Sequence, residues 1–121
     1  MYADYVFYTD TYLGTMIPDE KAFKRTARDA EQKLDLYTLE RIDQADDRIR
    51  LAVCKMSDVL YRSEQRKKQH DGREVSSENN DGYSVSYAAV NEQDYMRLVE
   101  EELYNAAYTY LSQTGLMDWS D

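Results

Sequence analysis

The scarcity of residues that break helices most constrains how this chain can fold. Among its 121 residues there are four glycines and one proline. A many-stranded β fold needs turns at short intervals, and those turns draw heavily on glycine and proline. Three long segments instead repeat apolar residues at intervals of three and four positions, the spacing of one face of an α-helix. The sequence therefore predicts an all-α protein with one domain, residues 1–121.

The three periodic segments predict helices over residues 18–36, 44–69 and 92–113, packed antiparallel. Pro18 suits a first helical position, and the run from Asp43 to Asp46 resembles a capping box. The apolar stripes are Phe23, Ala27, Ala30 and Leu34 in the first helix, Ile49, Val53, Met56 and Leu60 in the second, and Tyr95, Val99, Leu103, Ala106 and Tyr110 in the third.

The remaining segments lie before the first helix and between the last two. Residues 1–17 are aromatic and turn-rich, which predicts an ordered arm with one helical turn. Residues 71–91 predict a polar loop followed by an extended segment, because residues 83–88 alternate large and small side chains. A lone extended segment leaves backbone donors and acceptors unpaired. It can pair with the arm, lie against a helix with water on its free groups, or add to a neighbouring subunit.

The charge of the chain is unevenly distributed. Residues 1–69 hold 13 Lys and Arg against 13 Asp and Glu, so residues 70–121 carry the whole net charge of −9. A duplex-binding surface needs clustered Lys and Arg, which argues against tight DNA binding. Acidity of this kind suits a passage through which DNA slides without sticking, or it merely keeps a small protein soluble.

Residue types that carry catalysis or bind metals are scarce. The single histidine, His70, ends a charged helix, and the single cysteine, Cys54, lies beside an apolar stripe, where it reads as a small buried hydrophobe. One of each is too few for a zinc site, and no phosphate-binding glycine loop is present. We therefore expect no catalytic residue, metal or cofactor, no small-molecule substrate and no membrane span. A lone cysteine and the lack of signal-peptide features at the N-terminus favour a reducing cytoplasm.

Tyrosine is the compositional oddity, with twelve residues against two Phe and one Trp. Tyrosine offers apolar area with a polar tip and is enriched at protein interfaces. A small core cannot bury so many, so some are expected to meet a partner chain, although half-exposed core edges would also account for them. The candidate subunit-interface residues are Tyr2, Tyr5, Tyr8, Tyr83, Val85, Tyr87 and Trp119.

Five segments in this order resemble the small head–tail connector proteins, also called adaptor or head-completion proteins, of tailed phages and prophages. The resemblance covers nearly the whole chain and rests on packing and turn positions. The segments are Tyr2-Ala3-Asp4-Tyr5 through Tyr12-Leu13-Gly14, the helix start Ile17-Pro18 with Phe23 and Ala30, Arg48-Ile49-Arg50-Leu51-Ala52-Val53-Cys54, Gly82-Tyr83-Ser84-Val85-Ser86-Tyr87, and Tyr110-Leu111 with Thr114-Gly115-Leu116.

The resemblance implies a structural protein that forms a homo-oligomeric ring of about a dozen subunits below the portal. It implies as partners the portal protein and the next head–tail completion or tail protein, with transient, non-specific passage of DNA through the central hole. The protein would then occur in the bacterial cytoplasm during assembly and at the head–tail interface of the virion. The alternative is a small helical regulatory or adaptor protein that binds one protein partner.

Overall fold

A computed structural model describes residues 2–72 and 92–117 of the chain. All the regular secondary structure in these residues is α-helical, which confirms the predicted fold class. The helices are α1 (Tyr5–Asp10), α2 (Glu20–Tyr37), α3 (Asp47–Gly72) and α5 (Glu92–Leu111). The three long ones match the three predicted helices to within about three residues at each end.

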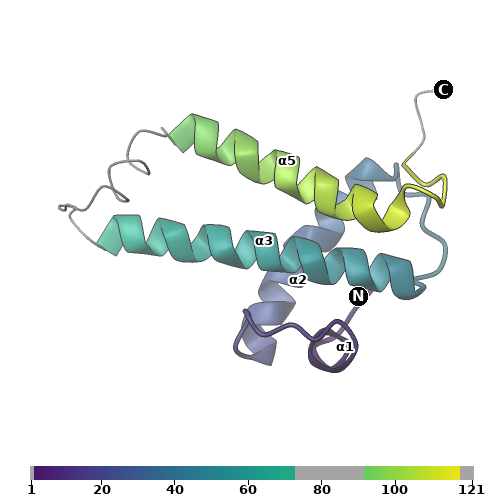
Figure 1. Ribbon diagram of the computed structural model, residues 1–121, viewed down its shortest axis with the longest axis horizontal. Coiled ribbons are helices and arrows are strands. Elements are labelled where there is room, and N and C mark those ends of the chain that lie inside the picture. Colours follow the sequence, from purple (N-terminus) through teal and green to yellow (C-terminus); the bar gives the residue numbers. More distant parts are fainter. Residues whose placement is uncertain (1, 73–91, 118–121) are drawn as a thin grey trace.

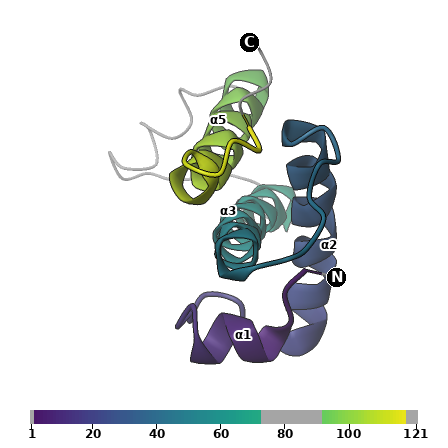
Figure 2. The ribbon, with the colours of Figure 1, turned by 90° about the vertical axis from the view of Figure 1, so that its right-hand side faces the viewer.

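Helix α3 is the centre of the molecule, with α1, α2 and α5 arranged around it (Figure 2). Its buried residues extend beyond the predicted stripe of Ile49, Val53 and Met56 to include Cys54 and Ser57. Cys54 lies on the side of the helix away from Ile49 and Met56, and Ser57 lies between Val53 and Cys54, because each residue turns the helix by about 100°. A helix covered on several sides buries a wide arc, so its sequence shows a weak amphipathic pattern.

Helix α5 runs antiparallel beside α3, whereas α2 crosses behind the pair (Figures 1 and 2). The crossing of α2 differs from the antiparallel packing predicted for all three helices. Small side chains on both helices, Ala27 and Ala30 on α2 and Ala52 on α3, are fully buried and permit a close crossing. Small residues of this kind suit both antiparallel and crossed helix packing, so the sequence does not reveal the angle between α2 and α3.

The helix starts differ from two details of the prediction. Asp19, and not Pro18, sets the start of α2, because its carboxylate accepts a hydrogen bond from the Ala22 N–H at 2.8 Å. Pro18 precedes this cap. At α3 the capping acid is Asp46, whose carboxylate accepts from the Ile49 N–H at 3.1 Å. Both helices therefore begin two or three residues later than predicted.

The link between α2 and α3 contains two consecutive non-glycine residues in the left-handed region, Leu39 (φ 55°) and Glu40 (φ 58°). Each such residue costs roughly 1–2 kcal/mol. Backbone bonds offset part of this cost, since the Glu40 N–H donates to the Asp35 carbonyl at 2.8 Å. The Arg41 guanidinium also donates to the carbonyls of Gly115 and Leu116, which joins this link to the chain after α5.

The N-terminal arm is ordered and contains one short helix, as predicted. Asp4 caps α1 by accepting a hydrogen bond from the Phe7 N–H at 2.9 Å. After α1 the chain turns back under the ring of Tyr8, where Gly14 donates its N–H to the Tyr8 carbonyl at 2.8 Å. A Cβ atom at Gly14 would lie 2.3 Å from the Tyr8 ring, so only glycine fits this return. The predicted extended segment at 83–88 lies outside the described residues.

Replacing Gly14 with alanine should destabilise the protein by at least about 1–3 kcal/mol, the usual cost of overpacking, because the buried Tyr8 ring must move. The comparison variant is Gly115→Ala, which meets no atom within 4 Å and is strained only by its φ of 80°. That variant should lose roughly 1–2 kcal/mol. Urea unfolding followed by circular dichroism measures both. Equal stability of Gly14→Ala and the wild type would contradict the packing described around Tyr8.

Candidate functional site

The tyrosines of the N-terminal arm mainly hold the arm to the helices. The Tyr2 hydroxyl donates to the Asp35 carboxylate on α2 at 2.7 Å, and the Tyr5 hydroxyl donates to the Ile17 carbonyl at 2.9 Å. Tyr8 is completely buried. Tyr8 was therefore wrongly predicted as an interface residue, because it fills the space between the arm and α3. Tyr2 and Tyr5 are half-buried and stay candidates only through their exposed edges.

The carboxylate of Asp58 on α3 receives two of these hydroxyls. Tyr8 donates to one oxygen at 2.6 Å and Tyr12 to the other at 3.1 Å. The Tyr8 hydroxyl also accepts a hydrogen bond from the Ile17 N–H at 3.0 Å. Burial, together with the nearby Asp58 charge, raises the pKa of both phenols well above the ordinary value. Both tyrosines are therefore neutral donors, and this cluster does not resemble a catalytic acid–base pair.

A different set of aromatic residues faces outward. Tyr104 and Tyr108 lie one turn apart on α5 with their rings stacked at 6.3 Å, and Tyr37 of α2 meets Tyr104 edge-on at 5.2 Å. Burial raises the pKa of Tyr37 to about 12. Tyr108 is 51 % exposed, and Leu36, beside Tyr37 in the chain, is 68 % exposed. We call these four residues, Leu36, Tyr37, Tyr104 and Tyr108, the tyrosine face.

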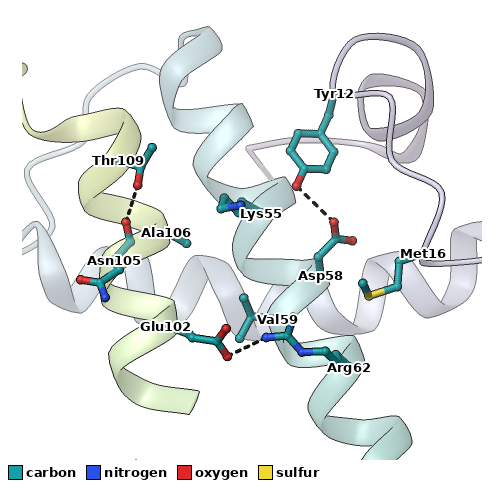
Figure 3. Close-up of a pocket in the computed structure, with 10 residues that line it drawn as sticks. All are labelled: Tyr12, Met16, Lys55, Asp58, Val59, Arg62, Glu102, Asn105, Ala106 and Thr109. Carbon is teal, nitrogen blue, oxygen red and sulfur yellow. Dashed lines mark hydrogen bonds and ion pairs between the residues drawn. The ribbon is translucent and has the colours of Figure 1, made fainter. Parts of the chain in front are cut away.

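A groove of about 340 Å³ lies on the other side of α5, above α3 (Figure 3). One wall comes from α5, with Ala106 and Thr109, and the opposite wall comes from the loop after α1, with Met16. Val59 of α3 lies between them, and Lys55 lies along its edge. Met16 is 41 % exposed there. The groove therefore combines a few apolar contacts with a larger number of polar and charged side chains, among them Asp58 and Arg62 of α3.

Ion pairs between helices account for much of the acidity of α5. Within the described residues the interhelical pairs join α2 to α3, α2 to α5 and α3 to α5. They are Arg25–Glu64 at 2.7 Å, Lys33–Glu100 at 2.6 Å and Arg62–Glu102 at 2.6 Å. The last of these closes one end of the groove (Figure 3). Charges that lie 39, 40 and 67 positions apart in the sequence are therefore brought together in the fold.

The basic run at the end of α3 also turns toward α5. Arg66 is buried, and its guanidinium carbon lies 3.8 Å from the centre of the Tyr95 ring, a close cation–π contact. Arg62 pairs with Glu102. These basic residues therefore pack against α5, in addition to lying near the C-terminal end of α3, where they complement the helix dipole. Arg62 and Arg66 are four residues apart, so the sequence alone predicts that both lie on one face of α3. Arg62 also lines the groove.

The described residues contain no grouping of three or more histidine, cysteine or acidic side chains able to hold a metal ion. Cys54 is completely buried, as predicted, and burial raises the pKa of its thiol to about 12. A thiol with that pKa and no access to solvent is not a nucleophile. Over the described part of the chain, no helix has the length and apolar character needed to cross a membrane.

Four of the predicted interface residues, Tyr83, Val85, Tyr87 and Trp119, lie outside the described residues. The side chain of His70 also lies outside them, although its backbone is in the last turns of α3. Tyr104 and Tyr108 were missed as interface candidates. The signal for them was present, because they are four residues apart on α5 and off the apolar stripe of Val99, Leu103 and Ala106.

Comparison with protein-family models, with curated proteins and with solved structures gives no match to this chain. We therefore infer the function from the surfaces and the chemistry of the molecule itself.

Removing the hydroxyl of Tyr8 should cost about 1–3 kcal/mol of stability, because Tyr8→Phe leaves the buried Ile17 N–H without its acceptor and Asp58 without one donor. Tyr5→Phe is the matched control, since it loses one bond to a carbonyl and should cost about 1 kcal/mol or less. Thermal and urea unfolding of the two variants measures the difference. A Tyr8→Phe protein no less stable than Tyr5→Phe would show that the Asp58 cluster does not hold the arm.

Proposed function

We propose that this protein is a structural assembly subunit, a head–tail connector whose copies form a ring below a phage portal and continue the DNA channel. The observation that carries the proposal is the presence of two separate exposed surfaces on one small helical body. The tyrosine face lies between α2 and α5, and the groove lies between α5 and the loop after α1. A ring requires two different surfaces on each subunit, because its contacts are heterologous.

The chemistry of the described residues supports an assembly role over catalysis. The hydroxyls of Tyr8 and Tyr12 are already used as donors to Asp58, and the Cys54 thiol is buried. An active site would require a pocket in which polar groups converge on a reacting atom. In the groove the Asp58 carboxylate already accepts from Tyr12, and Arg62 and Glu102 already form an ion pair with each other.

The electrostatics suit a channel that does not hold DNA. The net charge of −9 repels a phosphate backbone, and three of the cations, Arg25, Lys33 and Arg62, are already paired with carboxylates. Loosely held DNA can move through a ring, whereas a lining of free Lys and Arg would slow it.

The second candidate is a small adaptor that binds one protein partner as a monomer. The groove favours it, because a single segment of a partner could occupy about 340 Å³ of partly apolar space. The two functions differ in stoichiometry. A connector gives a large closed homo-oligomer alone or on a portal protein, and an adaptor gives a stable monomer and a one-to-one complex.

Truncating the tyrosine face should weaken assembly without unfolding the subunit. We expect Tyr104→Ala and Tyr108→Ala to lower the oligomeric fraction by about tenfold or more, since buried aromatic anchors commonly contribute 2 kcal/mol or more at interfaces. Leu98→Ala is the control, because Leu98 is comparably exposed on α5 but lies off this face. Mass photometry and negative-stain imaging, with and without a co-expressed portal protein, measure assembly, and circular dichroism checks folding. A wild-type chain that stays monomeric in both conditions would overturn the connector proposal.

A further inference from the structure

We propose that copies join head to tail across the two flanks of α5, with Tyr108 of one copy inserted into the groove at Met16, Val59 and Ala106 of the next. This inference rests on the proposed ring function and specifies which surfaces form the contact. It identifies the occupant of the groove as a second copy of the same chain.

The two surfaces lie on opposite flanks of one helix. Ala106 lines the groove and is two positions from both Tyr104 and Tyr108. Two positions correspond to about 200° around an α-helix. The tyrosines accordingly face α2, where Tyr104 meets Tyr37, whereas Ala106 faces α3 and the groove. Surfaces on opposite flanks cannot satisfy each other within one molecule, but they meet when identical copies line up side by side.

The size and composition of the groove fit one aromatic side chain. Its volume of about 340 Å³ is near the lower limit of small-molecule pockets, roughly 300–1,000 Å³. Met16 and Val59 offer apolar contacts for a ring, and the Asn105 amide and Thr109 hydroxyl at the rim can pair with a phenol hydroxyl. Tyr108 is the most exposed of the three rings in the tyrosine face, so it is the side chain that can be inserted.

Charge complementarity favours the same pairing. Lys55 lies at the edge of the groove and forms no ion pair within the described residues. Glu101 is exposed on α5, one turn before Tyr104. It too forms no ion pair with any described residue. Insertion of Tyr108 brings the acid of one copy toward the cation of the next, and opposite charges across an interface fix its register.

Cross-linking tests the contact directly. In the double variant Met16→Cys with Ser112→Cys, the second thiol lies four residues after Tyr108 and leaves the inserted ring in place. A short bis-maleimide should link copies of this variant into a ladder of dimers, trimers and higher species on a denaturing gel. Each single variant should give no ladder, because one thiol per copy cannot continue a chain. The wild type is a further control, since Cys54 is completely buried and does not react.

The outcomes separate this inference from the proposed function. Strong dimer formation by Ser112→Cys alone would mean that two tyrosine faces meet around a two-fold axis, and would overturn the head-to-tail contact. An oligomer by mass photometry without a ladder would overturn the contact and leave the ring proposal standing. A chain that is monomeric alone and with a portal protein, and forms no ladder, would overturn both.

Charge reversal provides a second, independent measurement. Lys55→Glu and Glu101→Lys should each weaken association by about fivefold, and the combined variant should recover most of the loss, since it restores opposite charges between copies. The matched controls change net charge equally at exposed sites away from both surfaces, with Lys67→Glu for the first and Asp29→Lys for the second. Sedimentation equilibrium gives the association constants. Losses that simply add in the combined variant would contradict the pairing of Lys55 with Glu101.

Discussion

The carboxylate of Asp58 is the interaction on which the rest of the architecture depends. The hydroxyls of Tyr8 and Tyr12 both donate to it, and they hold the arm against α3. Asp58 is half-buried, so without these donors its carboxylate would be only partly hydrated beside the aromatic rings of the arm. The arm therefore completes the core, and the main role of its aromatic residues is to stabilise the fold.

Charged residues that are distant in the sequence also pair with one another inside the molecule. Read along the sequence, the chain divides into a neutral part and an acidic part. In the fold, Lys33 and Arg62 reach Glu100 and Glu102 on α5. These exposed pairs contribute little energy each, roughly 0–1 kcal/mol. Their effect is to orient α5 on α2 and α3, and they leave Glu101 and Lys55 as charged groups available to a neighbour.

Much of the fold could be predicted from the sequence because its helices carry strong apolar periodicity. The predicted stripe from Phe23 to Leu34 is buried on α2, and Val99, Leu103 and Ala106 are buried on α5. The two tyrosines at the ends of the predicted α5 stripe, Tyr95 and Tyr110, are half-buried. The crossing of α2 could not be predicted, since small residues such as Ala27 and Ala30 suit several angles. The helix starts were displaced because Pro18 and Asp43 are plausible signals, and only hydrogen-bond geometry distinguishes them from Asp19 and Asp46.

The candidate site was harder to predict than the fold because composition does not say where a tyrosine points. Tyr8 and Tyr108 are chemically identical, yet one is completely buried and the other half exposed. The difference comes from long-range contacts, since Tyr8 is fixed by a residue fifty positions away. Residues that depend on such contacts are invisible to local patterns, whereas Tyr104 and Tyr108 could be placed from their spacing on α5 alone.

The position of both surfaces on α5 has a consequence for the shape of the proposed assembly. Both surfaces belong to one rigid helix, so their relative orientation is fixed. Each copy would therefore be placed on the next with the same rotation. Because the two flanks carry different surfaces, the contact between copies is heterologous, and its repetition gives a ring or an open chain, not a two-fold dimer. Closure then depends on how the α2 crossing and the arm set the tilt of α5. The same Asp58 contact that completes the core would therefore also limit the geometry of the ring.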